Sequence, residues 1–140
     1  MYTLHHDTEA FRTLITQISL EQSTAPEIIE KDYYVTLILQ EIAEKQKVYE
    51  VFFKGGTALY KALKSINRFS EDIDLTFNDQ KFESPTSKKR ALKMVTSKYL
   101  SSLLDPDAED SVSGSGSRTS IYTYPTLFEL DTFKNDTLSR

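Results

Sequence analysis

Two aspartates near the middle of the chain have the types and spacing that metal-dependent chemistry requires. Asp72 and Asp74 are two residues apart in an apolar stretch that is typical of a β-strand. Because side chains alternate along a strand, both carboxylates should leave the same face, about 7 Å apart along the chain. Neighbouring anions repel each other, and proteins commonly relieve that repulsion with a divalent cation held by oxygen ligands. The spacing therefore indicates a candidate metal site.

A glycine pair precedes these aspartates. We predict a buried strand from Val48 to Phe53, then Gly55, Gly56 and Thr57, then a helix from Thr57 to about Asn67. The free N–H groups and the dipole of a helix N-terminus favour an anion such as a phosphate. A phosphate site beside a metal-binding acidic pair points to nucleotide chemistry. The alternative is a glycine turn followed by a strand whose outer face is merely polar.

Other common catalytic and nucleotide-binding patterns are missing. A P-loop needs GxxxxGK[ST], but here Lys54 precedes the glycines, and the GxGxxG of dinucleotide-binding folds is also absent. The chain has no cysteine, which excludes a disulfide framework and a thiolate nucleophile. The two histidines, His5 and His6, are adjacent near the N-terminus, where we expect both to be exposed to solvent. Histidine therefore has no place in most catalytic schemes, including a serine triad.

The elements that would position these residues follow from hydrophobic periodicity. We expect helices from about Asp7 to Leu20, from a capping box at Thr24–Glu27 to about Lys45, and from Ser84 to about Leu104. We also expect a strand from Asp72 to Phe77, a flexible loop over residues 105–118 and a β-rich segment from Thr119 to Phe128. The second helix is apolar on more than one face, so it should be the central buried helix against the sheet. The pattern predicts an α+β fold.

Composition describes one ordinary globular domain. The chain has 140 residues, of which 39% are hydrophobic and 27% charged. Its first 24 residues are polar with interleaved apolar positions, unlike a signal peptide or a membrane anchor, so a cytoplasmic location without membrane contact is the default expectation. The net charge of −4 argues against the domain as a whole being a generic nucleic-acid binder, and any such contact would need a local patch.

One such patch lies on the predicted helix that starts at Ser84. It holds five basic residues and no acidic residue among them: Lys88, Lys89, Arg90, Lys93 and Lys98. Two interpretations remain open, a solvated helix face or an electrostatic landing site for a triphosphate or an RNA backbone.

A second charged feature lies in the central helix, where Lys31 and Asp32 sit among apolar residues. They either form a surface ion pair with Glu27 or Glu30, or brace the face of the protein that carries the site.

Three blocks in order carry a family resemblance. They are Glu30-Lys31-Asp32-Tyr33-Tyr34-Val35, Phe53-Lys54-Gly55-Gly56-Thr57-Ala58-Leu59 and Arg68-Phe69-Ser70-Glu71-Asp72-Ile73-Asp74-Leu75. Together they resemble the AbiEii/AbiGii nucleotidyltransferase toxins of type IV toxin–antitoxin and abortive phage-infection systems. The similarity covers most of residues 24–77 and weakens beyond them. It implies a polymerase β-like nucleotidyltransferase fold, a small mixed sheet packed with helices, in which residues 1–47 form N-terminal helices and residues 48–77 form the core.

The resemblance also implies an activity. A nucleotide would be transferred from Mg²⁺–NTP to an acceptor, a tRNA end or a protein hydroxyl in relatives, while pyrophosphate leaves. Asp72 and Asp74 would be catalytic and bind Mg²⁺. The nucleotide-binding residues would be Lys54, Gly55, Gly56, Thr57, Arg68 and Ser70. For Arg68, a structural pairing with Glu71 is the alternative. A cognate antitoxin would be a further partner.

The sequence departs from the family pattern late in the chain. The family places a third carboxylate on a later strand, and neither Glu129 nor Asp131 matches it convincingly. The chain ends at Arg140, roughly half the length that the family leads us to expect. The resemblance therefore implies the N-terminal portion of a longer transferase, a single truncated domain over residues 1–140. The alternative function is a non-catalytic remnant or an interaction module of such a toxin.

Overall fold

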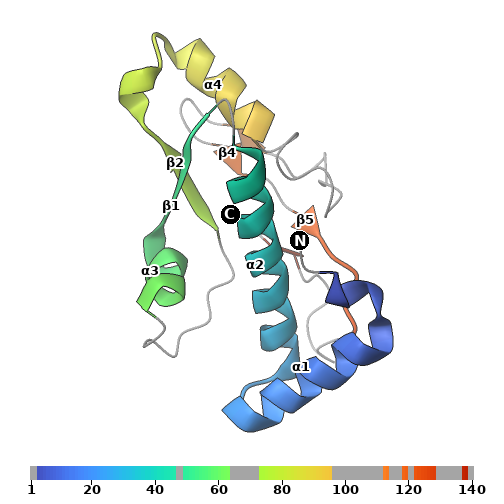
Figure 1. The fold of residues 1–140 in the computed structure, drawn as a ribbon. Helices are drawn as coiled ribbons and strands as arrows, with labels where there is room; N and C mark the ends of the chain where they lie inside the picture. Colours follow the sequence, from blue (N-terminus) through green and yellow to red (C-terminus); the bar gives the residue numbers. More distant parts are fainter. Residues whose placement is uncertain are drawn as a thin grey trace.

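The computed structural model describes residues 3–46, 49–63, 73–95, 112–113, 118–119, 122–128 and 137–138. Within these ranges the helices are α1 (Thr8–Gln22), α2 (Pro26–Lys45), α3 (Gly55–Leu63) and α4 (Pro85–Met94), with short 3-10 helices η1 (Leu4–His6) and η2 (Asp79–Lys81) (Figure 1). The strands are β1 (Val51–Lys54), β2 (Asp74–Phe77), β3 (Val112–Ser113), β4 (Arg118–Thr119), β5 (Tyr122–Thr123) and β6 (Thr137–Leu138). The predicted α+β class is confirmed. The strands pair as β1–β2, β3–β4 and β5–β6, all antiparallel, so the described residues do not form the mixed sheet that was expected.

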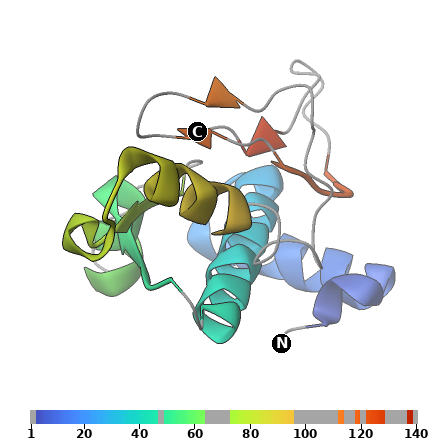
Figure 2. The same cartoon turned by 90° about the horizontal axis from the view of Figure 1, so that it is seen from above.

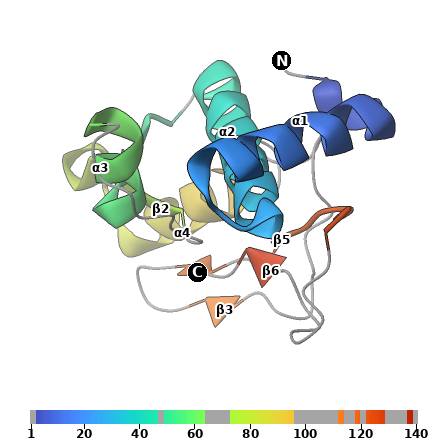
Figure 3. The ribbon, with the colours of Figure 1, turned by 90° about the horizontal axis from the view of Figure 1, so that it is seen from below.

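Helix α2 is the central element, as its apolar pattern predicted. It lies between α1 on one side and the β1–β2 sheet on the other (Figures 1 and 2). Its buried apolar residues are Ile29, Tyr34, Val35, Leu37, Ile38 and Ile42. Helix α1 crosses α2 and contributes Phe11 and Ile15 to the same core (Figure 3). A helix that is apolar on more than one face can pack against two partners at once, and α2 does so.

The two N-terminal helices begin in different ways. Asp7 caps α1, because its side chain accepts a hydrogen bond from the backbone N–H of Ala10 at 3.0 Å. The capping box predicted for α2 is wrong. The residue before α2 is Ala25, which has no side-chain cap, and the hydroxyl of Thr24 donates to the carbonyl of Gln22 instead. The proline at the start of α2 supplies a φ already suited to a helix and lacks an N–H that would need a partner.

The β1–β2 sheet has an apolar inner face and a polar outer face. Val51 lies opposite Phe77 and Phe53 opposite Leu75 on the inner face, which packs against the core. On the outer face Phe52 lies opposite Thr76, and Lys54 lies opposite Asp74. As the alternation of side chains along a strand requires, Leu75 and Phe77 point toward the core and Asp74 points away from it.

Several boundaries differ from the predictions. Strand β1 runs from Val51 to Lys54, whereas a strand from Val48 to Phe53 was predicted, and β2 begins at Asp74 rather than at Asp72. Helix α3 begins at Gly55 rather than at Thr57, so the glycines form its first turn. The loop predicted over residues 105–118 contains β3, which pairs with β4 through Val112 and Thr119. The ladder satisfies backbone N–H and C=O groups that a loop would leave to water. The predicted ends of the helices at Asn67 and Leu104 lie outside the described residues.

Candidate functional site

The candidate site lies at one end of the β1–β2 sheet. Strand β1 ends at Lys54, directly opposite Asp74, which is the first residue of β2. Helix α3 starts at the next residue, Gly55. The antiparallel register therefore brings the end of one strand, the start of the other and a helix N-terminus together in one place (Figure 1). This places four of the predicted site residues side by side: Lys54, Gly55, Gly56 and Asp74.

Any residue other than glycine at position 55 would force the surrounding structure to change. Its φ is +82°, in the left-handed region that L side chains rarely adopt. A β-carbon at this position would stand 2.6 Å from Oδ2 of Asp74. The absent side chain is what allows the carboxylate to lie over the first turn of α3. At Gly56 an added β-carbon would meet nothing within 4 Å, so the backbone there faces open space.

The electrostatics of this corner suit a ligand with both a cation and phosphates. Lys54, Gly55, Gly56 and Asp74 are all exposed. The first turn of α3 contains no acidic residue of its own, so no carboxylate from the helix itself competes with a ligand for its N–H groups. An exposed carboxylate offers the hard oxygen ligand that Mg²⁺ prefers. The corner therefore combines a helix end that would suit an anion with an oxygen that would suit a cation.

Several predicted site residues cannot be placed. Arg68, Ser70 and Asp72 lie outside the described residues, and Thr57 is described only as part of the first turn of α3. Among the side chains that the structure describes, no group of three or more histidine, aspartate or glutamate residues could hold a metal ion. The described part of the site thus contributes one of the two predicted metal-binding carboxylates.

An ion pair anchors α3 to α2. Nζ of Lys61 lies 2.7 Å from Oδ1 of Asp32 and donates to the hydroxyl of Thr36 at 2.8 Å. Both charged side chains are partly buried, 23% and 27% exposed. Asp32 therefore pairs with a residue of the next helix along the chain and holds the helix whose N-terminus forms the candidate site. A pairing of Lys31 with Glu27 or Glu30 stays a prediction, and so does the bracing of a functional face.

Glu30 is a residue whose role the sequence did not indicate. It is 0% exposed, and both of its carboxylate oxygens accept hydrogen bonds from the segment Tyr122–Phe128. Oε1 accepts from the backbone N–H of Leu127 at 2.8 Å and Oε2 from the hydroxyl of Thr126 at 2.6 Å. An acidic residue within an apolar helical stripe must have such partners, because burying an unpaired carboxylate is costly. The presence of an acidic residue among the apolar residues of this helix was the sequence feature that could have indicated such partners.

Tyr34, one helical turn after Glu30, reinforces the same contact. Its ring stacks on Tyr124 with the centroids 4.4 Å apart, and its hydroxyl donates to the carbonyl of Pro125 at 3.3 Å. On α1, the guanidinium of Arg12 lies over the ring of Phe128, 5.2 Å from its centroid. Burial, helped by the charge of Glu30 and by Tyr33, raises the pKa of Tyr34 to about 12.

His5 is not fully exposed, contrary to the prediction. It lies in η1, half-buried, with Nδ1 3.0 Å from the hydroxyl of Tyr33. Burial and the neighbouring His6 lower the pKa of His5, because both disfavour the charged imidazolium. This contact packs η1 against α2. It is a contact of the N-terminal helices, and His5 is not among the residues of the candidate site.

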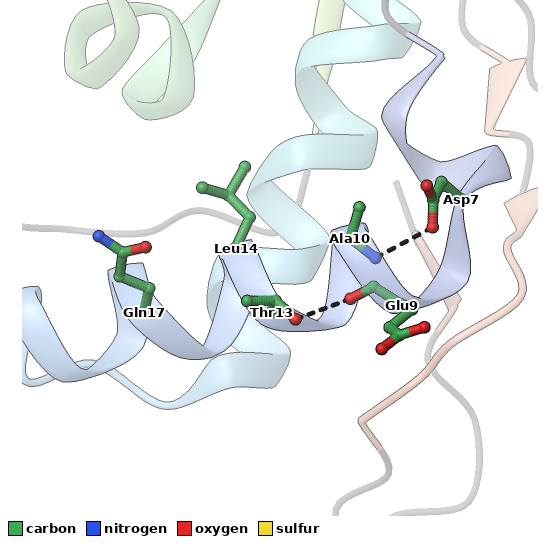
Figure 4. Close-up of a pocket in the computed structure, with 6 residues that line it drawn as sticks. All are labelled: Asp7, Glu9, Ala10, Thr13, Leu14 and Gln17. Atoms are coloured by element: carbon green, nitrogen blue, oxygen red, sulfur yellow. Dashed lines mark hydrogen bonds between the residues drawn. The ribbon is translucent and has the colours of Figure 1, made fainter.

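A surface depression of about 430 Å³ on α1 is a second concave feature. It is lined by Asp7 and by five residues of one helix, Glu9, Ala10, Thr13, Leu14 and Gln17 (Figure 4). The hydrogen bonds drawn there, from the N–H of Ala10 to Asp7 and from the Thr13 hydroxyl to the carbonyl of Glu9, belong to the helix itself. No second element lines it, and we assign it no chemistry.

A glycine-started helix directly after one strand, beside an aspartate on the neighbouring strand, is the arrangement that the nucleotidyltransferase resemblance implies. The family model of the nucleotidyl transferase AbiEii toxin of type IV toxin–antitoxin systems matches residues 37–134. That match covers more than half of the chain, so the chain belongs to this family. No curated protein and no solved structure was found to match it. None of the helices in the described part of the chain is long and apolar enough to span a membrane.

The matched range contains both halves of the corner, Gly55 and Asp74, together with Arg68, Ser70 and Asp72. It begins after the block that holds Glu30, Asp32 and Tyr34. The contacts of that block are therefore a feature of this structure that the family match does not cover.

Proposed function

We propose that the corner formed by Lys54, Gly55, Gly56 and Asp74 binds a nucleoside triphosphate with Mg²⁺ and transfers its nucleotide to an acceptor. The observation that carries this proposal is the Asp74 carboxylate lying over the glycine that starts α3. That contact supports the proposal, because a carboxylate oxygen suits Mg²⁺ and the N–H groups of a helix N-terminus suit a phosphate. The proposal includes a polymerase β-like fold for residues 1–140, with residues 48–77 as its core.

The residues present fit a magnesium ion. Asp74 is exposed, and the missing side chain of Gly55 leaves space for its carboxylate at the helix end. Mg²⁺ is typically bound by one or two carboxylates together with substrate phosphates and water. Asp74 would hold it together with Asp72, which the alternation of a strand would place on the same face. When bound, the ion supplies positive charge for the phosphates and polarises the reacting phosphoryl group.

The remaining residues of the corner would bind and orient the triphosphate. The N–H groups of Gly55, Gly56 and Thr57 at the start of α3 would donate to phosphate oxygens. Lys54 on the outer face of β1 would add a positive charge beside them. Two residues that the sequence pattern adds, Arg68 and Ser70, complete the proposed set, with Arg68 as a phosphate partner.

The reaction is an in-line displacement at the α-phosphorus. A bond forms between the acceptor hydroxyl oxygen and that phosphorus, the bond from the phosphorus to the bridging oxygen breaks, and pyrophosphate leaves while the acceptor proton passes to solvent. A tRNA end or a protein hydroxyl would be the acceptor, and a cognate antitoxin would be the binding partner, as the toxin–antitoxin family suggests.

Transfer of the labelled α-phosphate of each NTP to total tRNA and to protein, with and without Mg²⁺, tests the proposal. Asp74→Ala should lower the rate about 100-fold or more, because it removes a group that acts in the transition state. Asp72→Ala should do the same. Glu44→Ala, an exposed carboxylate at the far end of α2, is the matched control and should keep the rate. Equal rates for Asp74→Ala and the control would refute the assignment.

A further inference from the structure

The exposed arc of α4 after Pro85 consists of one threonine, Thr86, and three basic residues. Lys89, Arg90 and Lys93 are exposed, and they are neighbours at the i, i+3 and i, i+4 spacings of a helix. Ala91 and Val95 are buried on the opposite side, against the core. The rotation of α4 is therefore fixed by packing, and the basic residues face solvent as a consequence.

The charge of this arc differs from that of the whole chain. The ten residues of α4 hold four basic side chains and no acidic one, whereas the chain has a net charge of −4. Lys89 and Arg90 make no ion pair with any residue that the structure describes. The arc is therefore a local concentration of positive charge on an acidic protein, the kind of surface that attracts anions.

The basic face of α4 is separate from the candidate site. Helices α3 and α4 lie at opposite ends of the β1–β2 sheet (Figure 1). Asp74 starts β2 at the site, and β2 extends for about 10 Å before the chain turns through η2 into α4. A nucleic acid carries one phosphate per nucleotide along its whole length, so a segment of it outside the candidate site can contact this surface.

The composition of the arc also disfavours a membrane surface. Interfacial helices place large apolar side chains beside their basic ones and bury them among lipids. The exposed large apolar residues of the described chain lie elsewhere, on α1, α2 and β1: Leu14, Leu20, Ile28 and Phe52. On α4, Ala91 belongs to the core, and Leu92 and Met94 pack against it.

We propose that the α4 face formed by Lys89, Arg90 and Lys93 binds the phosphodiester backbone of a nucleic acid. The cations are spread over about 6 Å of helix axis, so they can contact successive phosphates of one strand. Such binding displaces condensed counterions and weakens steeply with salt. It does not depend on the Gly55–Asp74 corner, and Asp74→Ala should bind nucleic acid as the natural chain does.

Fluorescence anisotropy with a labelled single-stranded RNA of about 20 nucleotides, at salt concentrations from about 50 to 200 mM, tests the proposal. The double variant Lys89→Gln/Arg90→Gln should bind about tenfold or more weakly. The slope of log K against log salt should become less steep by about 1.4, because two phosphate contacts on a single strand are lost. The control is Thr13→Glu/Gln22→Glu, which lowers the net charge by the same two units on exposed positions of α1.

The outcomes distinguish RNA binding by the α4 face from an effect of net charge and from binding of lipid. Loss of affinity in the α4 variant alone, with unchanged circular dichroism, supports the proposal, whether RNA and DNA of the same sequence bind equally or RNA binds better. Equal loss in the α1 control would assign the binding to overall charge and overturn it. Unchanged affinity in the α4 variant would also overturn it, as would tighter binding to phosphatidylserine vesicles than to RNA.

Discussion

Oδ2 of Asp74 lies 2.6 Å from the point where a β-carbon on Gly55 would stand. The contact joins the start of β2 to the start of α3, and it depends on Gly55 having both no side chain and a φ of +82°. A strand register, a backbone conformation and a carboxylate position are therefore coupled at one glycine. Because Gly56 follows directly and faces open space, the two glycines have different roles that single substitutions can separate.

Gly55→Ala should destabilise the chain by about 1–3 kcal/mol. The new methyl group would meet the Asp74 carboxylate, and the left-handed φ would strain an alanine backbone. The free energy of unfolding from urea titration measures the loss. The same variant should also displace the Asp74 carboxylate and so lower nucleotide transfer.

Gly56→Ala is the matched control, because it adds the same methyl group one residue later. Nothing lies within 4 Å of the new β-carbon, and alanine restricts the unfolded chain more than glycine does. Gly56→Ala should therefore stabilise the chain by about 0.4–1 kcal/mol. Equal free energies of unfolding for the two variants would contradict the geometry described for this corner.

The ion pair between Asp32 and Lys61 should hold α3 in place. A double-mutant cycle with Asp32→Asn and Lys61→Met isolates the coupling energy of the pair. Because both side chains are partly buried, the coupling should reach about 0.5–1.5 kcal/mol, above the usual value for a fully exposed pair. Faster hydrogen exchange of the α3 amides in either single variant would show where that energy acts. A coupling of zero would mean that α3 is held by packing alone.

The sequence predicted those features that depend on local periodicity. The apolar faces of α2 and the alternation that turns Asp74 outward follow from residues within a few positions of one another. The sequence left open whether β1 and β2 run parallel or antiparallel, and that choice decides which residues meet Asp74. The partners of Glu30 and Asp32 lie 97 and 29 residues further along the chain, where no local pattern reaches.

The failed capping box at Thr24 has a related cause. The pattern of Thr24 and Glu27 fits the rule, but the chain leaves α1 through Ser23 in the left-handed conformation. The Thr24 hydroxyl then donates to the carbonyl of Gln22 rather than accepting from α2. The conformation of the turn between α1 and α2 determines which partner the Thr24 hydroxyl has, and a four-residue motif does not describe that conformation.

Glu30→Gln should weaken the attachment of the segment Tyr122–Phe128 to α2. The substitution keeps the shape but replaces one accepting oxygen with an NH₂ group that faces a donor, either the N–H of Leu127 or the hydroxyl of Thr126. The loss should be about 1.5–3 kcal/mol, as is usual for hydrogen bonds to a charged group. Hydrogen exchange at the Leu127 amide should become faster.

Glu44→Gln serves as the control for this substitution, because Glu44 is exposed on the same helix and accepts a bond from Gln40. It should leave the Leu127 amide unchanged and alter stability by less than about 0.5 kcal/mol. Similar exchange rates at Leu127 in the two variants would mean that Glu30 does not hold the segment.

Tyr34 should titrate later than an ordinary tyrosine. Its pKa is raised to about 12, so the folded state binds its proton more tightly than the unfolded chain, whose tyrosines titrate near their ordinary value of 10.0. The stabilisation is thus fully present below pH 10 and is lost as pH rises from 10 toward 12. The chain has eight tyrosines, and subtracting the phenolate absorbance of Tyr34→Phe from that of the natural chain isolates this one. A difference curve centred near pH 10 would contradict the burial described. In Glu30→Gln the midpoint should move lower, because the Glu30 charge contributes to the raised pKa.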